Sequence, residues 1–279
     1  MIDDAPGLPG ETPAASVPGA LEPEALAPAS TDMLAPRPLA PPRSRGADRL
    51  RALFEVFLCS GLPTQLLIEQ ALVMAGVRPF AGADHLNAPF IFVVALTDTV
   101  LIILLAWLLL RADGESFRTV VFGARPLGRE LLAGVSMIAP VIVGAALVVL
   151  AARWVWPALH NVPDNPLIGM LHSPRDVALF AVTAVVAGGV REEVQRAFLL
   201  TRFEQHLGGK WLGLALTSVA FGAGHALQGW DATVVTGLLG LTWGAVYLRR
   251  RSAMAPMISH IGFNGLQVVA FLVAGARGV

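Results

Sequence analysis

The residues best suited to chemistry lie in the stretch Gly188-Gly189-Val190-Arg191-Glu192-Glu193-Val194-Gln195-Arg196, which puts four formal charges into an apolar segment. Each charge at the centre of a bilayer costs about 2.5 to 3.5 kcal/mol on insertion scales. The cluster therefore needs internal partners or a water-filled cavity. Glu192 and Arg196 are four residues apart, in the order that favours an ion pair on one helix face. Glu193 points about a quarter turn away, which leaves it free for another role.

Two histidines and an asparagine lie in later apolar segments. His225 ends the run Phe221-Gly222-Ala223-Gly224-His225, and His260 and Asn264 are one helical turn apart. A single histidine in an apolar helix is more often a packing residue than a catalyst. Because each polar group here carries its own desolvation cost, the economical arrangement is one shared cavity in which they bind one another. The alternative is that residues 191–196 end a helix and reach water at the interface.

The composition around these residues is that of a membrane protein. Of the 279 residues, 55% are hydrophobic and 14% are charged, against about 25% charged in soluble domains. Apolar runs of about 20 residues can cross a bilayer as helices. The sequence therefore predicts an all-α polytopic transmembrane helical bundle of about seven helices, at 52–76, 88–110, 130–152, 177–201, 211–227, 231–248 and 254–275.

The rest of the sequence bears on the domain organisation and on the classes of function that can be excluded. Residues 1–45 are rich in Pro and Ala and predict a disordered tail, with residues 46–279 as the membrane domain. The charge is balanced, with 20 basic and 20 acidic residues, so no basic face for nucleic acid is expected. The single cysteine, Cys59, excludes an intrachain disulfide within this sequence. The first span carries Glu55, Gln65 and Glu69 and could instead lie in the interface.

The arginines predict an orientation, because Lys and Arg favour cytoplasmic loops. With the amino terminus in the cytoplasm, seven spans leave few basic residues outside, namely Arg78, Arg153, Arg175 and Arg277. We therefore predict a cytoplasmic amino terminus and an external carboxyl terminus. This bias suits an integral protein of the bacterial inner (cell) membrane, surrounded by membrane lipid.

Three motifs in order, the Glu192-Glu193 pair followed by Arg196, Phe221-x-x-x-His225 and His260-x-x-x-Asn264, resemble the CPBP family of intramembrane proteases. That family includes the eukaryotic Rce1-type CAAX proteases and the bacterial Abi proteins, and the resemblance covers about residues 175–270. The usual family spacing is Glu-Glu-x-x-x-Arg, whereas this chain is one residue shorter. Anchoring on Arg196 puts Arg191 at the first glutamate position and Glu192 at the second. Anchoring on the pair moves the arginine instead, so both glutamates stay candidates.

The resemblance implies a glutamic-type peptidase that cleaves a membrane-anchored protein or peptide, or its carboxyl-terminal tail. One glutamate would be the general base to a water held by His225. His260 and Asn264 would donate hydrogen bonds to the oxyanion, and Arg196 would hold the second glutamate. No cofactor is expected.

Three alternatives stay open. A zinc site could form from Glu192, His225 and His260, although zinc has no need of Asn264 and the sequence lacks His-Glu-x-x-His. An ion- or proton-coupled transporter also uses intramembrane acids and histidines, but the two halves show no internal repeat. The shortened glutamate spacing favours the third, a non-catalytic scaffold or immunity protein with the same fold.

Overall fold

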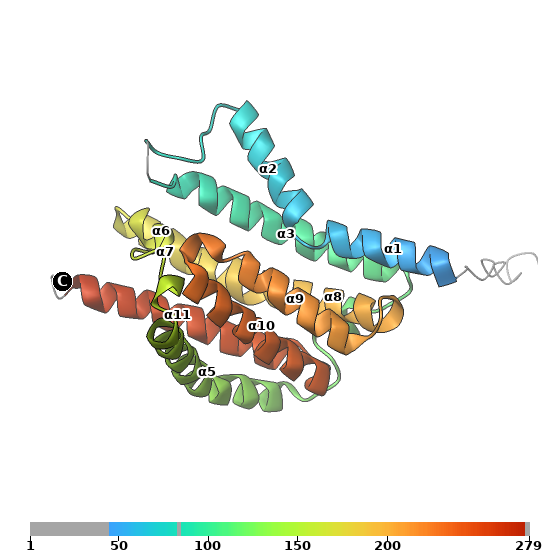
Figure 1. Cartoon of the computed structure of the whole chain (residues 1–279). Coiled ribbons are helices and arrows are strands. Elements are labelled where there is room, and N and C mark those ends of the chain that lie inside the picture. The colour runs from blue at the N-terminus through green and yellow to red at the C-terminus, as the bar shows by residue number, and fades with distance from the viewer. Residues whose placement is uncertain (1–44, 83–84, 277–279) are drawn as a thin grey trace, which may run out of the picture. The chain divides into compact units, whose positions relative to one another are not determined.

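The computed structural model describes residues 45–82 and 85–276, and the tail predicted to be disordered lies outside these residues except for Arg45. Within the described part the chain is helical, and one isolated β-bridge joins Phe80 to Leu86. The all-α fold is confirmed. The helices are α1 Arg45–Leu58, α2 Leu62–Met74, α3 Ala88–Ala112, α4 Phe117–Val121, α5 Leu127–Val155, α6 Pro166–Gly169, α7 Pro174–Thr183, α8 Glu192–His206, α9 Lys210–Ala223, α10 Trp230–Arg250 and α11 Met254–Ala276 (Figure 1).

Four helices of the described part are long and apolar enough to cross a membrane by themselves: α3, α5, α10 and α11. The bent pair α1–α2 raises the number to five if it forms one span. Two further predicted spans, 177–201 and 211–227, are largely helical, but neither contains a single helix that is long and apolar enough to cross a membrane. The range 177–201 is divided among α7, a π-helical segment and the charged start of α8, and α9 has only 14 residues.

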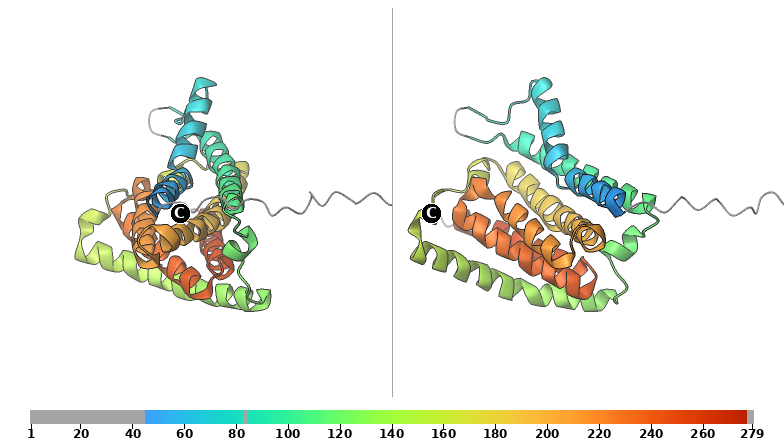
Figure 2. Two further views of the ribbon diagram at one scale, coloured as in Figure 1. Left: turned by 90° about the vertical axis from the view of Figure 1, so that its right-hand side faces the viewer. Right: turned by 45° about the vertical axis from the view of Figure 1, so that its right-hand side comes forward.

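The first predicted span, 52–76, is not one straight helix. It breaks between α1 and α2, whose axes differ by 42°. Gly61 caps α2 with a φ of 87°, and Pro63 follows in the first turn. A positive φ favours glycine, and proline suits a helix start, so these residues place the break here. α2 packs against α3 through Ile68, Phe90 and Val94 and extends away from the rest of the bundle (Figures 1 and 2).

Local capping fixes the start of two helices that lead to the site. Asn87 caps α3 by accepting a hydrogen bond from the Phe90 backbone. Ser173 and Asp176 form a capping box at α7, and Pro174 occupies the first turn. These contacts satisfy backbone N–H groups that a helix cannot pair internally.

Glycines bring the carboxyl-terminal helices close together. A Cβ on Gly222 of α9 would lie 2.6 Å from the backbone oxygen of Thr233 on α10. A Cβ on Gly134 of α5 would lie 2.6 Å from the Ile258 side chain on α11. Small residues at such crossings let membrane helices pack by close contact. The fully buried Trp243 of α10 fills the space between these helices and the site.

Candidate active site

A π-helical segment, Ala184–Arg191, joins α7 to α8 and ends directly before Glu192. Its wider turn is often found at functional sites. Asn264 of α11 donates from Nδ2 to the Ala184 oxygen at 2.9 Å. A Cβ on Gly188 would lie 2.6 Å from that same Nδ2, so glycine is needed for α11 to approach the segment.

Glu193 is the buried carboxylate of the site, with 1% of the residue exposed. Its Oε1 accepts from Arg196 and lies 2.9 Å from His260 Nδ1. The predicted pair between Glu192 and Arg196 is therefore wrong, because Arg196 binds Glu193 instead. Residues three and four apart both lie on one helix face, so spacing alone did not decide between them. The second oxygen of Glu193 is buried without a hydrogen-bond partner.

Aromatic rings hold His260 in place. Its ring stacks on Trp243 with centroids 3.8 Å apart and meets Phe221 edge-on at 6.2 Å. Phe221 also faces the Arg196 guanidinium, which lies 4.7 Å from the ring centroid. The imidazole is therefore fixed between Trp243 and Glu193, with its Nε2 edge directed to the other glutamate.

Glu192 is bound more loosely than Glu193. Its side chain is 15% exposed, and its Oε1 lies 3.4 Å from Arg191 Nη2. Its Oε2 lies 3.8 Å from His260 Nε2, which is too long for a direct hydrogen bond. One water molecule could bridge a polar gap of this size.

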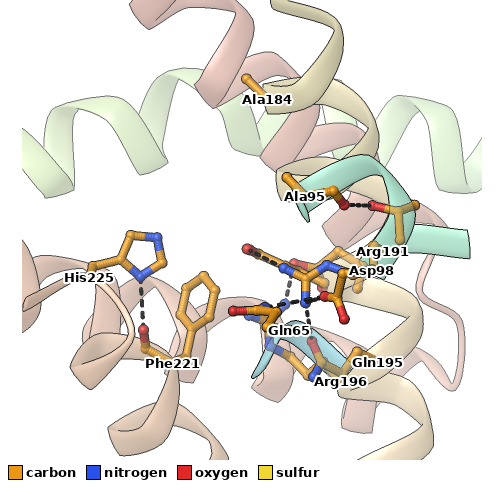
Figure 3. Close-up of polar contacts among 12 residues, drawn as sticks. Gln65, Ala95, Asp98, Ala184, Arg191, Gln195, Arg196, Phe221 and His225 are labelled. Atoms are coloured by element: carbon orange, nitrogen blue, oxygen red, sulfur yellow. Dashed lines mark hydrogen bonds and ion pairs between the residues drawn. The ribbon is translucent and has the colours of Figure 1, made fainter. Parts of the chain in front are cut away.

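Two predicted site residues lie apart from the carboxylates. His225 follows α9 in a short turn, where its Nδ1 lies 2.9 Å from the Phe221 oxygen and its ring is 5.0 Å from the Phe221 ring (Figure 3). Among the described contacts, neither His225 nor Asn264 bonds to Glu192 or Glu193. The structure thus brings together Glu192, Glu193, Arg196 and His260, and Phe221 links this group to His225.

Asp98 is a polar partner of this region that was not among the predicted site residues. It lies on α3, is buried, and its Oδ2 lies 3.2 Å from Arg191 Nη1. Thr64 and Gln65 of α2 donate to its two oxygens, and Gln195 accepts from Arg191, as Figure 3 shows in part. A carboxylate inside a predicted span was the available signal, since such groups are costly and usually functional.

The geometry also bears on the zinc alternative. Within residues 45–82 and 85–276, no three His, Cys, Asp or Glu side chains are grouped closely enough to hold a metal ion. Glu192, His225 and His260 are therefore not assembled as ligands in this arrangement.

The fold and the site define a membrane-embedded helical bundle with a buried carboxylate–histidine cluster. Residues 173–266 match the family described as type II CAAX prenyl endopeptidase Rce1-like. This match supports the assignment of the segment to the CPBP, or CAAX-type, family of intramembrane proteases and confirms the resemblance seen in the motifs. The segment contains all six predicted site residues. Searches among curated proteins and solved structures gave no significant match.

Proposed function

We propose that this protein is an intramembrane endopeptidase with Glu192 as its general base. The observation that carries the proposal is the pair of atoms Glu192 Oε2 and His260 Nε2, which face each other at 3.8 Å. Glu193 engages the opposite edge of the same imidazole at 2.9 Å. A carboxylate in that position orients the ring and favours the proton on Nδ1. Nε2 then accepts a hydrogen bond from a water molecule beside Glu192, so we assign His260 to water binding in place of the oxyanion role that the resemblance implied.

The reaction follows from that position. Glu192 takes a proton from the water while the water oxygen attacks the peptide carbonyl carbon. As the peptide C–N bond breaks, that proton passes to the leaving amine nitrogen. Glu193 is less suited to be the base, because Arg196 and His260 bind one of its oxygens and the other is fully buried, whereas the Glu192 side chain is 15% exposed. It instead orients His260, while Arg196 balances its charge.

His225 and Asn264 keep the roles that the family resemblance predicts, namely water binding and oxyanion binding. His225 has Nε2 available, since only Nδ1 is near the Phe221 oxygen. Asn264 donates one N–H to the Ala184 oxygen and retains a second N–H. These two assignments are proposals, and the loss of cleavage in His225→Ala and Asn264→Ala would support them.

The substrate that we propose is a membrane-anchored protein or peptide cut near its carboxyl-terminal tail. The test uses purified protein in lipid vesicles with a set of anchored tail peptides, and mass spectrometry of the new termini. Wild type should cleave, and Glu192→Gln should not. Glu204→Gln is the matched control, because Glu204 is on the same helix but pairs with Arg251 at the helix end.

The same experiment separates the alternatives. Equal cleavage by wild type and Glu192→Gln would overturn Glu192 as the base. No cleavage of any tail by the folded wild type would favour the scaffold, and ion flux into the vesicles would favour the transporter.

For the location, we propose the bacterial cell membrane with the amino terminus in the cytoplasm, on the distribution of arginines. A reporter fused after Val279 should be active only outside the cytoplasm. Cytoplasmic activity would instead indicate an even number of crossings, with the bent pair α1–α2 not crossing.

A further inference from the structure

Arg191 places a positive charge beside the proposed general base. Its Nη2 lies 3.4 Å from Glu192 Oε1, and 12% of its side chain is exposed. A guanidinium can bind both oxygens of a carboxylate in a forked pair. If Arg191 bound Glu192 in that way, it would occupy the lone pairs with which the base accepts a proton.

Asp98 binds the other terminal nitrogen of Arg191. Its Oδ2 lies 3.2 Å from Arg191 Nη1, and its side chain is 1% exposed. Thr64 donates to Oδ1 at 2.5 Å and Gln65 donates to Oδ2 at 3.2 Å. The carboxylate is therefore held by α2 while it holds a cation of the π-helical segment.

We propose that Asp98 is a positioning residue for the hydrolysis, acting through Arg191. It keeps the guanidinium on the α3 side, so that Glu192 retains a free oxygen for water. Gln195 assists, because its Oε1 accepts from Arg191 at 3.2 Å while its Nε2 donates to the Cys59 oxygen at 2.7 Å. The inference rests on the proposed function, since it assigns a task relative to the base Glu192.

The break between α1 and α2 makes this arrangement possible. A Cβ on Gly61 would lie 3.4 Å from Arg191 Nη1 and 3.3 Å from Gln65 Nε2. The bare glycine lets the chain turn against the guanidinium and start α2 there. Thr64 and Gln65, in the first turn of α2, consequently reach Asp98.

The test compares wild type, Asp98→Asn, Arg191→Gln and the double variant, with kcat, KM and thermal unfolding measured for each. Asp98→Asn should lower kcat roughly tenfold or more with little change in KM, because the released Arg191 binds Glu192. The double variant should recover most of that kcat, since the cation has gone as well. Asp113→Asn is the control, because Asp113 binds Arg202 at the end of α3 and should affect stability only.

Two results would overturn the inference while leaving the proposed function intact. One is an unchanged kcat in Asp98→Asn; the other is a double variant as slow as Asp98→Asn, which a purely structural role of Asp98 predicts. A folded wild type without Glu192-dependent cleavage would overturn the proposed function, and this inference with it.

Discussion

Arg196 and Arg202 are buried on the same helix, α8, and their surroundings differ. The Arg202 side chain is 1% exposed and binds Glu55, Asp113 and Glu115 at 2.6, 2.9 and 2.6 Å. These acids come from α1 and from the chain that follows α3. Arg196 instead binds Glu193 of its own helix and faces the Phe221 ring.

The difference indicates that the charges around Arg202 stabilise the fold, whereas those around Arg196 are available for catalysis. Around Arg202 the acids meet the cation directly, and Arg51 adds a second positive charge to Glu55 and Asp113. The cluster therefore ties α1 and the end of α3 to α8. Around Arg196 a further carboxylate, Glu192, makes only long contacts, and one oxygen of Glu193 is unpartnered. Oxygens with free lone pairs can bind water, which a fully paired cluster cannot do.

Removing the loosely bound carboxylate should have the largest effect. We expect Glu192→Gln to lower kcat by about 10²- to 10⁴-fold, the range for loss of a general base. The thermal unfolding temperature should change little, because Gln has nearly the same shape and Glu192 makes only long contacts. A large loss of stability with a normal kcat for the folded fraction would show that Glu192 stabilises the fold and is not the base.

Removing the structural cation should act on stability instead. Arg202→Met removes a buried cation from Glu55, Asp113 and Glu115. Arg51 still pairs with the first two acids, so we expect a cost of about 3 kcal/mol, the low end for a broken buried pair. We expect a clear drop in unfolding temperature, and an unchanged kcat per folded molecule. A variant that is stable but inactive would contradict a purely structural role for the Arg202 cluster.

Glu193→Gln should produce a mixed effect. The amide oxygen can still accept from Arg196 but no longer balances its charge, so we expect a loss of about 2 kcal/mol in stability. Cleavage should also slow, because His260 loses the carboxylate that orients it. Activity and unfolding measured on the same preparation check both parts, and a change in stability alone would remove Glu193 from the mechanism.

A more exposed pair gives the smallest expected effect. Arg251 binds Glu204 beyond the predicted end of the span at residue 201, and this hydrogen bond lowers the pKa of Glu204. The stabilisation is therefore present at neutral pH and is lost as the pH falls through the lowered pKa. We expect less than about 1 kcal/mol, reduced further by salt. The difference in unfolding temperature between wild type and Glu204→Gln should disappear at acid pH.

The sequence could predict the bundle because helix-length apolar runs leave little choice in a bilayer. It could not predict the break at Gly61, since glycine and proline are also found within continuous membrane helices. The unexpected bend has a local cause, the positive φ of Gly61 beside Pro63.

The sequence predicted which residues form the site better than it predicted which of them bind each other. Buried polar groups need partners, so the glutamates, Arg196, both histidines and Asn264 were expected together. The structure joins Glu192, Glu193, Arg196 and His260 and leaves His225 and Asn264 apart. The choice of Glu193 over Glu192 as partner of Arg196 depends on side-chain direction beyond the spacing. The contact between Asp98 and Arg191 depends on how α3 packs against the π-helical segment, which no local pattern encodes.

The π-helical segment Ala184–Arg191 has a consequence for how this chain tolerates changes in length. A turn closed by i→i+5 bonds holds one residue more than an α-helical turn, so an insertion can be absorbed there while the helix on either side keeps its phase. Conversely, deleting Val186 should tighten the turn and leave Glu192 and Glu193 facing His260. The same deletion within α8, at Val194, would rotate the following residues by about 100° and turn Arg196 away from Glu193. Loss of one residue is thus expected to be harmless on one side of Arg191 and disabling on the other, which cleavage by the two deletion variants would reveal.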